Sequence, residues 1–260
     1  MSNGGEILLA KQIDDFAFRT FRDVADCDYV SARLSHRAKL YAQFLWQAQQ
    51  AIEKYLKCIL LLNRIPAAHV KHDINKGLLA AKKLPFDVKT SNGPDAFLQY
   101  LNRFGPWRYL ESSYFAKGLE LQMLDKTVWE IRRFCQNLQV RDPQHHDRFL
   151  GLVSDKLSAI SKSDDLPPQD FKLQGGRLEK IVDDRSNRAR TALIWQNLFY
   201  GIRRRDRLAN VDNSFHATNS PLWLHPELVD HLVPFVYLPN HVAAAYREQA
   251  REKARAPATK

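Results

Sequence analysis

The chain has 260 residues, and 45% of them are hydrophobic, which is enough for one large folded domain or two small ones. Its formal net charge of +10 favours a polyanionic partner such as RNA, although a basic protein without such a partner is the alternative. The three cysteines lack a CxxC spacing, and no signal peptide or bilayer-long apolar run is found, so we expect a cytoplasmic protein with no disulfide, zinc site or membrane partner.

Helical periodicity dominates the first half of the chain. Apolar residues recur every three or four positions within residues 14–34, 41–62 and 117–138, and the short connection after the first of these favours antiparallel neighbours. Asp73 is placed to cap a further helix that begins at Ile74. Strand patterns are scarce throughout the chain. The sequence therefore predicts an all-α antiparallel helical bundle.

Charged residues alternate with the apolar ones in the helix expected at residues 117–138. Leu119, Met123, Val128 and Ile131 are spaced to share one side of this helix. A separate charged face is formed by Asp125, Lys126, Glu130, Arg132 and Arg133. We therefore expect a helix that packs on the bundle through its apolar stripe, with the charged face beside it.

Polar residues form a second stripe on the helix expected at residues 41–62. Gln50, Glu53 and Lys57 lie three or four positions apart, and the next helix opens with His72, Asp73 and Ile74. The pattern Gln-Ala-x-Glu-Lys-x-x-Lys followed by His-Asp-Ile resembles the HEPN domain (higher eukaryotes and prokaryotes nucleotide-binding). An ordinary surface pair between Glu53 and Lys57 is the structural alternative.

The resemblance covers about the first half of the chain. It implies a HEPN-like bundle over residues 1–140, with a helical C-terminal extension over residues 141–260. It also implies a protein that binds nucleotide or RNA without a cofactor, as a homodimer and within a prokaryotic defence or toxin–antitoxin system. A separate nucleotidyltransferase-type or antitoxin partner is expected on the same grounds. The residues that would line the ligand site are Gln50, Glu53, Lys57, His72 and Arg108.

A metal-independent endoribonuclease is the alternative function. Many HEPN proteins carry an Arg followed by four to six residues and a His, in which His acts as general acid or base and Arg neutralises charge on the phosphorane. This sequence has two such matches, Arg141 with His146 and Arg64 with His69. About two matches are expected by chance in an Arg-rich chain. A non-catalytic interaction module is therefore kept as a further alternative.

The C-terminal extension contains a basic segment at residues 177–207. Aromatic residues are interleaved with its arginines, and this combination can bind phosphates and stack bases. An amphipathic helix with aromatic residues in its core is the alternative. The candidate nucleic-acid-binding residues are Arg185, Arg188, Arg203, Arg204 and Arg205.

Overall fold

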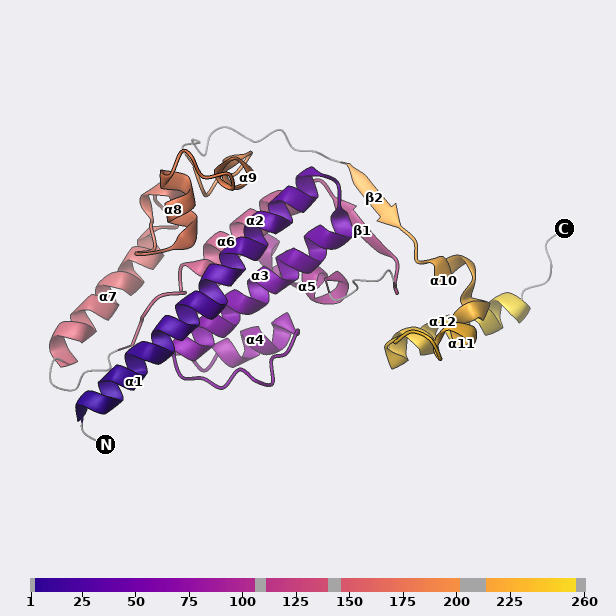
Figure 1. Cartoon of the computed structure of the whole chain (residues 1–260), viewed down its shortest axis with the longest axis horizontal. Helices are drawn as coiled ribbons and strands as arrows, with labels where there is room; N and C mark the ends of the chain where they lie inside the picture. The colour runs from indigo at the N-terminus through magenta and orange to yellow at the C-terminus, as the bar shows by residue number, and fades with distance from the viewer. Residues whose placement is uncertain (1–2, 106–110, 140–145, 202–213, 256–260) are drawn as a thin grey trace. The chain divides into compact units, whose positions relative to one another are not determined.

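The computed structural model describes residues 3–105, 111–139, 146–201 and 214–255, and these residues are predominantly helical (Figure 1). They divide into two compact units. Unit 1 comprises Met1–Pro106 and Leu119–Val211, and unit 2 comprises Trp107–Gly118 and Asp212–Lys260. The predicted all-α class is confirmed, and no helix in the described ranges is long and apolar enough to cross a membrane.

Long helices form the centre of unit 1. The helix α1 (Asn3–Phe16) continues through a π-helical stretch (Ala17–Arg22) into α2 (Asp23–Arg37), and α3 (Tyr41–Leu62) returns beside α2 (Figure 1). Unit 1 also contains the helices α4 (Ile74–Ala81), α5 (Asn92–Phe104), α6 (Glu120–Arg132), α7 (His146–Lys162), α8 (Arg177–Asp183) and α9 (Arg190–Ile194).

The predicted apolar stripe of α3 forms the core of unit 1. Its members Ala48, Ile52, Tyr55, Ile59 and Leu62 are fully buried. They recur every three or four residues, so a single helix face supplies one continuous apolar surface to α2, α4, α5 and α6. The start of the following helix is also confirmed, because an Asp73 carboxylate oxygen accepts a hydrogen bond from the Lys76 backbone N–H at 3.2 Å.

The charged face of α6 lies inside the structure. Asp125, Glu130, Arg132 and Arg133 are each at most 7% exposed, whereas the Lys126 side chain of the same face is 39% exposed. Asp125, Arg132 and Arg133 find their partners on α2 and in residues 160–200. Glu130 accepts hydrogen bonds from the Ser91 backbone N–H at 2.8 Å and from the Ser91 hydroxyl at 2.7 Å. Unit 1 therefore contains residues from both sides of the domain boundary that the sequence predicted between residues 140 and 141.

Unit 2 is small and has its own core. The strands β1 (Tyr114–Lys117) and β2 (Phe215–Thr218) form a two-stranded antiparallel sheet in which Tyr114 pairs with Thr218. The helices α10 (Pro221–Leu224), α11 (Val229–Leu232) and α12 (Asn240–Arg255) follow. The buried cluster of this unit consists of Leu222, Val229, Val242, Ala243 and Tyr246.

Candidate functional site

The polar residues selected by the HEPN resemblance come together around the carboxylate of Glu53. The Lys57 Nζ lies 2.5 Å from Glu53 Oε1, and the His72 Nδ1 lies 3.0 Å from Glu53 Oε2. The Gln50 amide donates to the same Oε2 at 3.3 Å. We name Gln50, Glu53, Lys57 and His72 the Glu53 cluster. The structure thus joins four of the five residues expected in the ligand site, whereas Arg108 lies outside the described residues.

Burial within the Glu53 cluster is uneven. The Glu53 side chain is 4% exposed, while that of Lys57 is 20% exposed and that of His72 is 60% exposed. A buried carboxylate is tolerated when cationic or hydrogen-bonding groups surround it, and Lys57 and His72 provide these groups. The cluster therefore has an anionic base and presents an imidazole to solvent.

The position of His72 is fixed by its backbone as well as by its ring. The Gln49 amide on α3 donates to the His72 carbonyl oxygen at 2.7 Å, and the Trp46 ring lies 6.3 Å from the His72 ring between centroids. Because Nδ1 is held by Glu53, the ring has a defined orientation. Its Nε2 makes no hydrogen bond with the described residues, so this nitrogen can exchange a proton or contact a ligand.

A groove borders the Glu53 cluster on the side of Lys57. It has a volume of about 520 Å³ and is lined by Lys57 and Arg64 together with Phe16, Phe21 and apolar residues of the segment that follows α3. The Phe16 side chain is exposed, and its ring meets that of Phe21 edge-on at 6.1 Å between centroids. Two cations and an exposed aromatic ring therefore share one surface.

The structure describes one of the two candidate catalytic pairs, Arg64 with His69, but not the side chains of the other, Arg141 with His146. Arg64 contacts Asp14 at 3.0 Å and donates to the Ala10 carbonyl oxygen at 2.9 Å, which ties the end of α3 to α1. His69 is exposed, and no hydrogen bond or ion pair joins it to Arg64 in the described structure. Arg141 lies outside the described residues. His146 begins α7, and its side chain is outside the described part.

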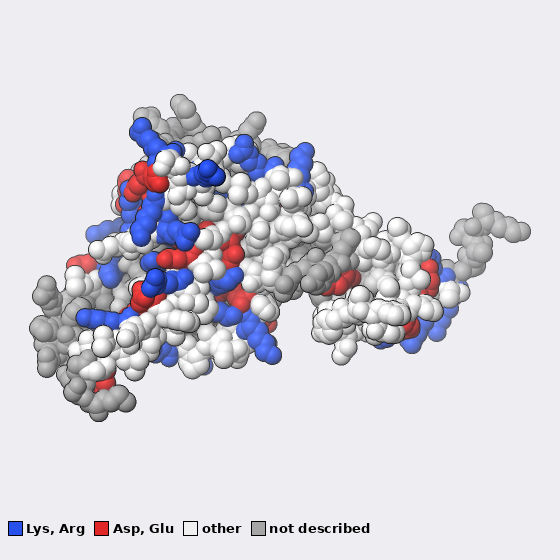
Figure 2. Space-filling view, in the orientation of Figure 1, with Lys and Arg blue, Asp and Glu red and all other residues white. Residues whose placement is uncertain are grey.

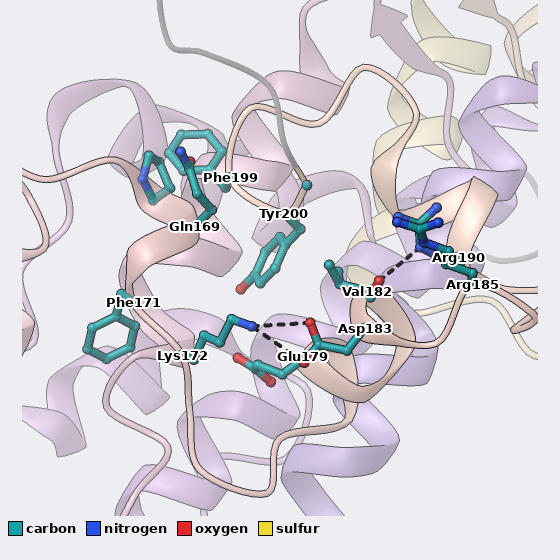
Figure 3. Close-up of a pocket in the computed structure, with 12 residues that line it drawn as sticks. Gln169, Phe171, Lys172, Glu179, Val182, Asp183, Arg185, Arg190, Phe199 and Tyr200 are labelled. Carbon is teal, nitrogen blue, oxygen red and sulfur yellow. Dashed lines mark hydrogen bonds and ion pairs between the residues drawn. The ribbon is translucent and has the colours of Figure 1, made fainter.

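The basic segment at residues 177–207 is also described only in part. Arg203, Arg204 and Arg205 lie outside the described residues. Arg188 is exposed, and Arg185 lines a pocket of about 370 Å³ that the sequence did not predict (Figure 3). The walls of this pocket, which we name the Tyr200 pocket, come from residues 168–172, from α8 and the turn after it, from Arg190 at the start of α9, and from residues 199–201.

An ion network lies beneath the Tyr200 pocket. Glu179, which lines the pocket, forms a paired contact with Arg132 at 2.7 and 2.8 Å, and Arg132 forms a second paired contact with Asp26 at 2.7 and 2.8 Å. Burial alone would raise the pKa of Glu179, but the Arg132 guanidinium outweighs it and holds this pKa below its ordinary value. Burial raises the pKa of Tyr200, with Arg132 opposing, so the phenol stays neutral.

Sequence reasoning missed most of the Tyr200 pocket because its lining residues come from separate turns. The interleaved arginines and aromatics of residues 177–207 were a partial signal, since Arg185, Phe199 and Tyr200 do meet there. Phe171 and Lys172 carried no comparable pattern. Among the described residues, no group of three or more His, Cys, Asp or Glu side chains is arranged to hold a metal ion.

The charge distribution does not by itself select either site. Figure 2 shows that Lys and Arg are interspersed with Asp and Glu on the face of unit 1 turned to the viewer. The local geometry of the Glu53 cluster and of the Tyr200 pocket is therefore more informative than the net charge. No protein-family model, curated protein or solved structure matches this chain.

Proposed function

We propose that the chain is a HEPN-like helical protein that binds nucleotide or RNA at the Glu53 cluster and its adjoining groove. The observation that supports the proposal best is that Lys57 belongs both to the Glu53 cluster and to the lining of the groove. It neutralises the buried Glu53 carboxylate, and it also lines the groove that contains Arg64 and Phe16. Residues selected by two separate sequence patterns therefore border a single surface.

The chemistry of the groove suits a single-stranded polynucleotide. Lys57 and Arg64 bring N–H donors for phosphates to the groove while each also contacts a carboxylate, that of Glu53 or of Asp14. The exposed Phe16 ring supplies a stacking surface for a base. His72 can donate from Nε2 to a phosphate oxygen when its ring is protonated. An open groove of this kind accommodates an extended strand, whose bases are available for stacking, more readily than a duplex.

The orientation of His72 favours ribonuclease activity as a second candidate. A histidine held at Nδ1 by a carboxylate has Nε2 available as a general base. In such a reaction Nε2 takes the proton of an RNA 2′-hydroxyl, and the resulting oxygen attacks the adjacent phosphorus. The bond to the 5′-oxygen breaks, that oxygen takes a proton from water, and a 2′,3′-cyclic phosphate remains.

Binding is tested by fluorescence anisotropy with a labelled single-stranded RNA in EDTA. Phe16→Ala should weaken binding about fivefold or more, because base stacking on one aromatic ring contributes about 1–3 kcal/mol. Leu9→Ala, which removes another exposed apolar side chain from α1, is the matched control and should leave affinity unchanged. Equal affinities for wild type, Phe16→Ala and Leu9→Ala would contradict binding in the groove.

Cleavage is tested in the same samples by gel electrophoresis. If the second candidate is correct, wild type cuts RNA in EDTA and His72→Ala retains the bound RNA but loses about a hundredfold or more in rate. His146→Ala is assayed beside it, because the sequence also selected that residue. Cleavage lost only in His146→Ala would assign the chemistry to His146 and leave His72 a binding role. Absence of cleavage in wild type would leave the binding function alone.

A further inference from the structure

The Tyr200 pocket is separate from the groove and has two chemically different ends. Its volume of about 370 Å³ lies in the range of sites for small molecules. Figure 3 shows Arg185 and Arg190 side by side at one end, Phe171 and Phe199 toward the other, and Tyr200 between them. A ligand that fills the pocket therefore meets cations at one end and aromatic surface at the other.

The floor of the pocket does not repel an anion. Glu179 is the buried acid of the lining, and its charge is balanced by the paired contact with Arg132. The other acid, Asp183, is bound by Lys172 at 3.1 Å. The arginines at the cationic end are not needed for either of these pairs, so the positive charge there is available to a ligand.

The cationic end is partly organised before any ligand arrives. The Arg190 Nε donates to the Val182 carbonyl oxygen at 2.9 Å, which fixes the plane of the guanidinium and leaves its terminal nitrogens for other contacts. Arg185 forms no hydrogen bond or ion pair with the described residues. Adjacent guanidinium groups provide the forked donors that phosphate oxygens accept, and they do so better than single ammonium groups.

The aromatic end is supported by packing behind it. The Phe199 ring stacks on Trp129 at 6.0 Å between centroids, and Phe171 meets the same Trp129 edge-on at 5.6 Å. Trp129 is buried in α6, so both rings are braced by the core of unit 1. A flat ring can therefore pack against a rigid apolar wall without reordering it.

We propose that the Tyr200 pocket binds a nucleoside monophosphate, with the phosphate at Arg185 and Arg190 and the base on the side of Phe199 and Tyr200. The pocket size selects a small molecule, and the separation of cationic and aromatic ends selects a planar ring joined to a phosphate. This site shares no residue with the Glu53 cluster or its groove. The inference does not rest on the proposed function and stands or falls separately.

Calorimetric titration of the full chain with AMP, adenosine and inorganic phosphate tests the inference. AMP should bind wild type, and adenosine and phosphate alone should each bind at least about tenfold more weakly because each contacts one end of the pocket. Arg185→Ala should weaken AMP binding about tenfold or more. Arg188→Ala, which removes an exposed arginine outside the lining, is the matched control and should leave AMP affinity unchanged.

The outcomes separate this pocket from the groove. Absence of AMP binding at millimolar concentration would overturn the inference, as would equal losses in Arg185→Ala and Arg188→Ala. Lys57→Met should retain the AMP binding that Arg185→Ala weakens, because Lys57 lines the groove and not the pocket, whereas AMP bound at the groove would be lost in Lys57→Met and retained in Arg185→Ala. If Lys57→Met weakened AMP binding as much as Arg185→Ala did, AMP would be bound outside the Tyr200 pocket and the assignment would be wrong.

Discussion

Glu179 connects the Tyr200 pocket to the interior of unit 1. It accepts hydrogen bonds from Arg132 and, at 3.1 Å, from the Leu173 backbone N–H. Arg132 in turn reaches Asp26, which also accepts from the Tyr55 hydroxyl at 2.7 Å. A single carboxylate thus links α8 and the segment before it to α2, α3 and α6, and its ionisation should affect the stability of unit 1.

Glu179→Gln should lower the free energy of unfolding by about 2 kcal/mol at neutral pH, because the variant loses charge-assisted hydrogen bonds to Arg132. The pKa of Glu179 is lower in the folded chain than in the unfolded chain, so its contribution is present above the unfolded value and is lost as pH falls through the folded value. Urea unfolding between pH 3 and 7 should therefore show the difference between wild type and variant shrinking below about pH 4.5. A constant difference would contradict the ionised pair.

Gly176 precedes α8 for reasons of space and not of backbone conformation. Its φ of −67° is ordinary, but a Cβ there would lie 1.9 Å from Glu179 Oε2 and 2.8 Å from Arg132 Nη2. We expect Gly176→Ala to destabilise the fold by about 1–3 kcal/mol, since the buried ion pair must shift. Gly151→Ala is the matched control, because nothing lies near its Cβ position and alanine in a helix should stabilise by about 0.5–1 kcal/mol. Similar melting temperatures for the two variants would contradict this account.

At the scale of elements, buried ion pairs hold residues 190–197 against the long helices. The Arg33 guanidinium on α2 pairs with Asp125 on α6, and its Nε donates to the Ala192 carbonyl oxygen of α9 at 3.0 Å. Asp125 also accepts from the Tyr29 hydroxyl at 2.6 Å. Side chains of α2 and α6 therefore determine where α9 lies.

Asp125→Ala should destabilise the fold by about 3–5 kcal/mol, because it leaves Arg33 buried without its carboxylate. Amide hydrogen exchange should increase most in residues 190–197, whose carbonyl groups Arg33 binds. Asp15→Ala, which removes an exposed ion pair with Arg19, is the control and should change stability by less than about 0.5 kcal/mol. If urea unfolding gave equal losses for both variants, the Arg33 network would not hold α9.

The sequence predicted the elements whose signals are local. The stripe on α3 and the Asp73 cap depend on residues within a few positions of one another, and both are confirmed. The burial of Arg132 could not be predicted, because its partner Asp26 lies 106 residues away and periodicity contains no information on such pairs. For the same reason the Glu53 cluster could be anticipated from one helix and the start of the next, whereas the Tyr200 pocket could not.

At the scale of the whole molecule, the net charge of +10 is a poor guide to where a polyanion would bind. Several arginines are used inside unit 1: Arg33, Arg132 and Arg133 are each at most 4% exposed and pair with Asp or Glu. Only cations that meet phosphates release counterions and make affinity depend on salt. The salt dependence of binding therefore identifies contacts between cations and phosphates, which the amino-acid composition cannot identify.

The most direct test of the central claim is the salt dependence of affinity for a single-stranded RNA, measured by anisotropy in EDTA. Wild type should bind with an affinity that falls steeply with salt, and Lys57→Met should reduce the slope of log K against log salt by about 0.7 to 1, the loss of one phosphate contact. Lys89→Met, which removes an exposed lysine outside the groove, should keep the wild-type slope. Equal slopes for Lys57→Met and wild type, with both variants folded by circular dichroism, would contradict RNA binding at the Glu53 cluster.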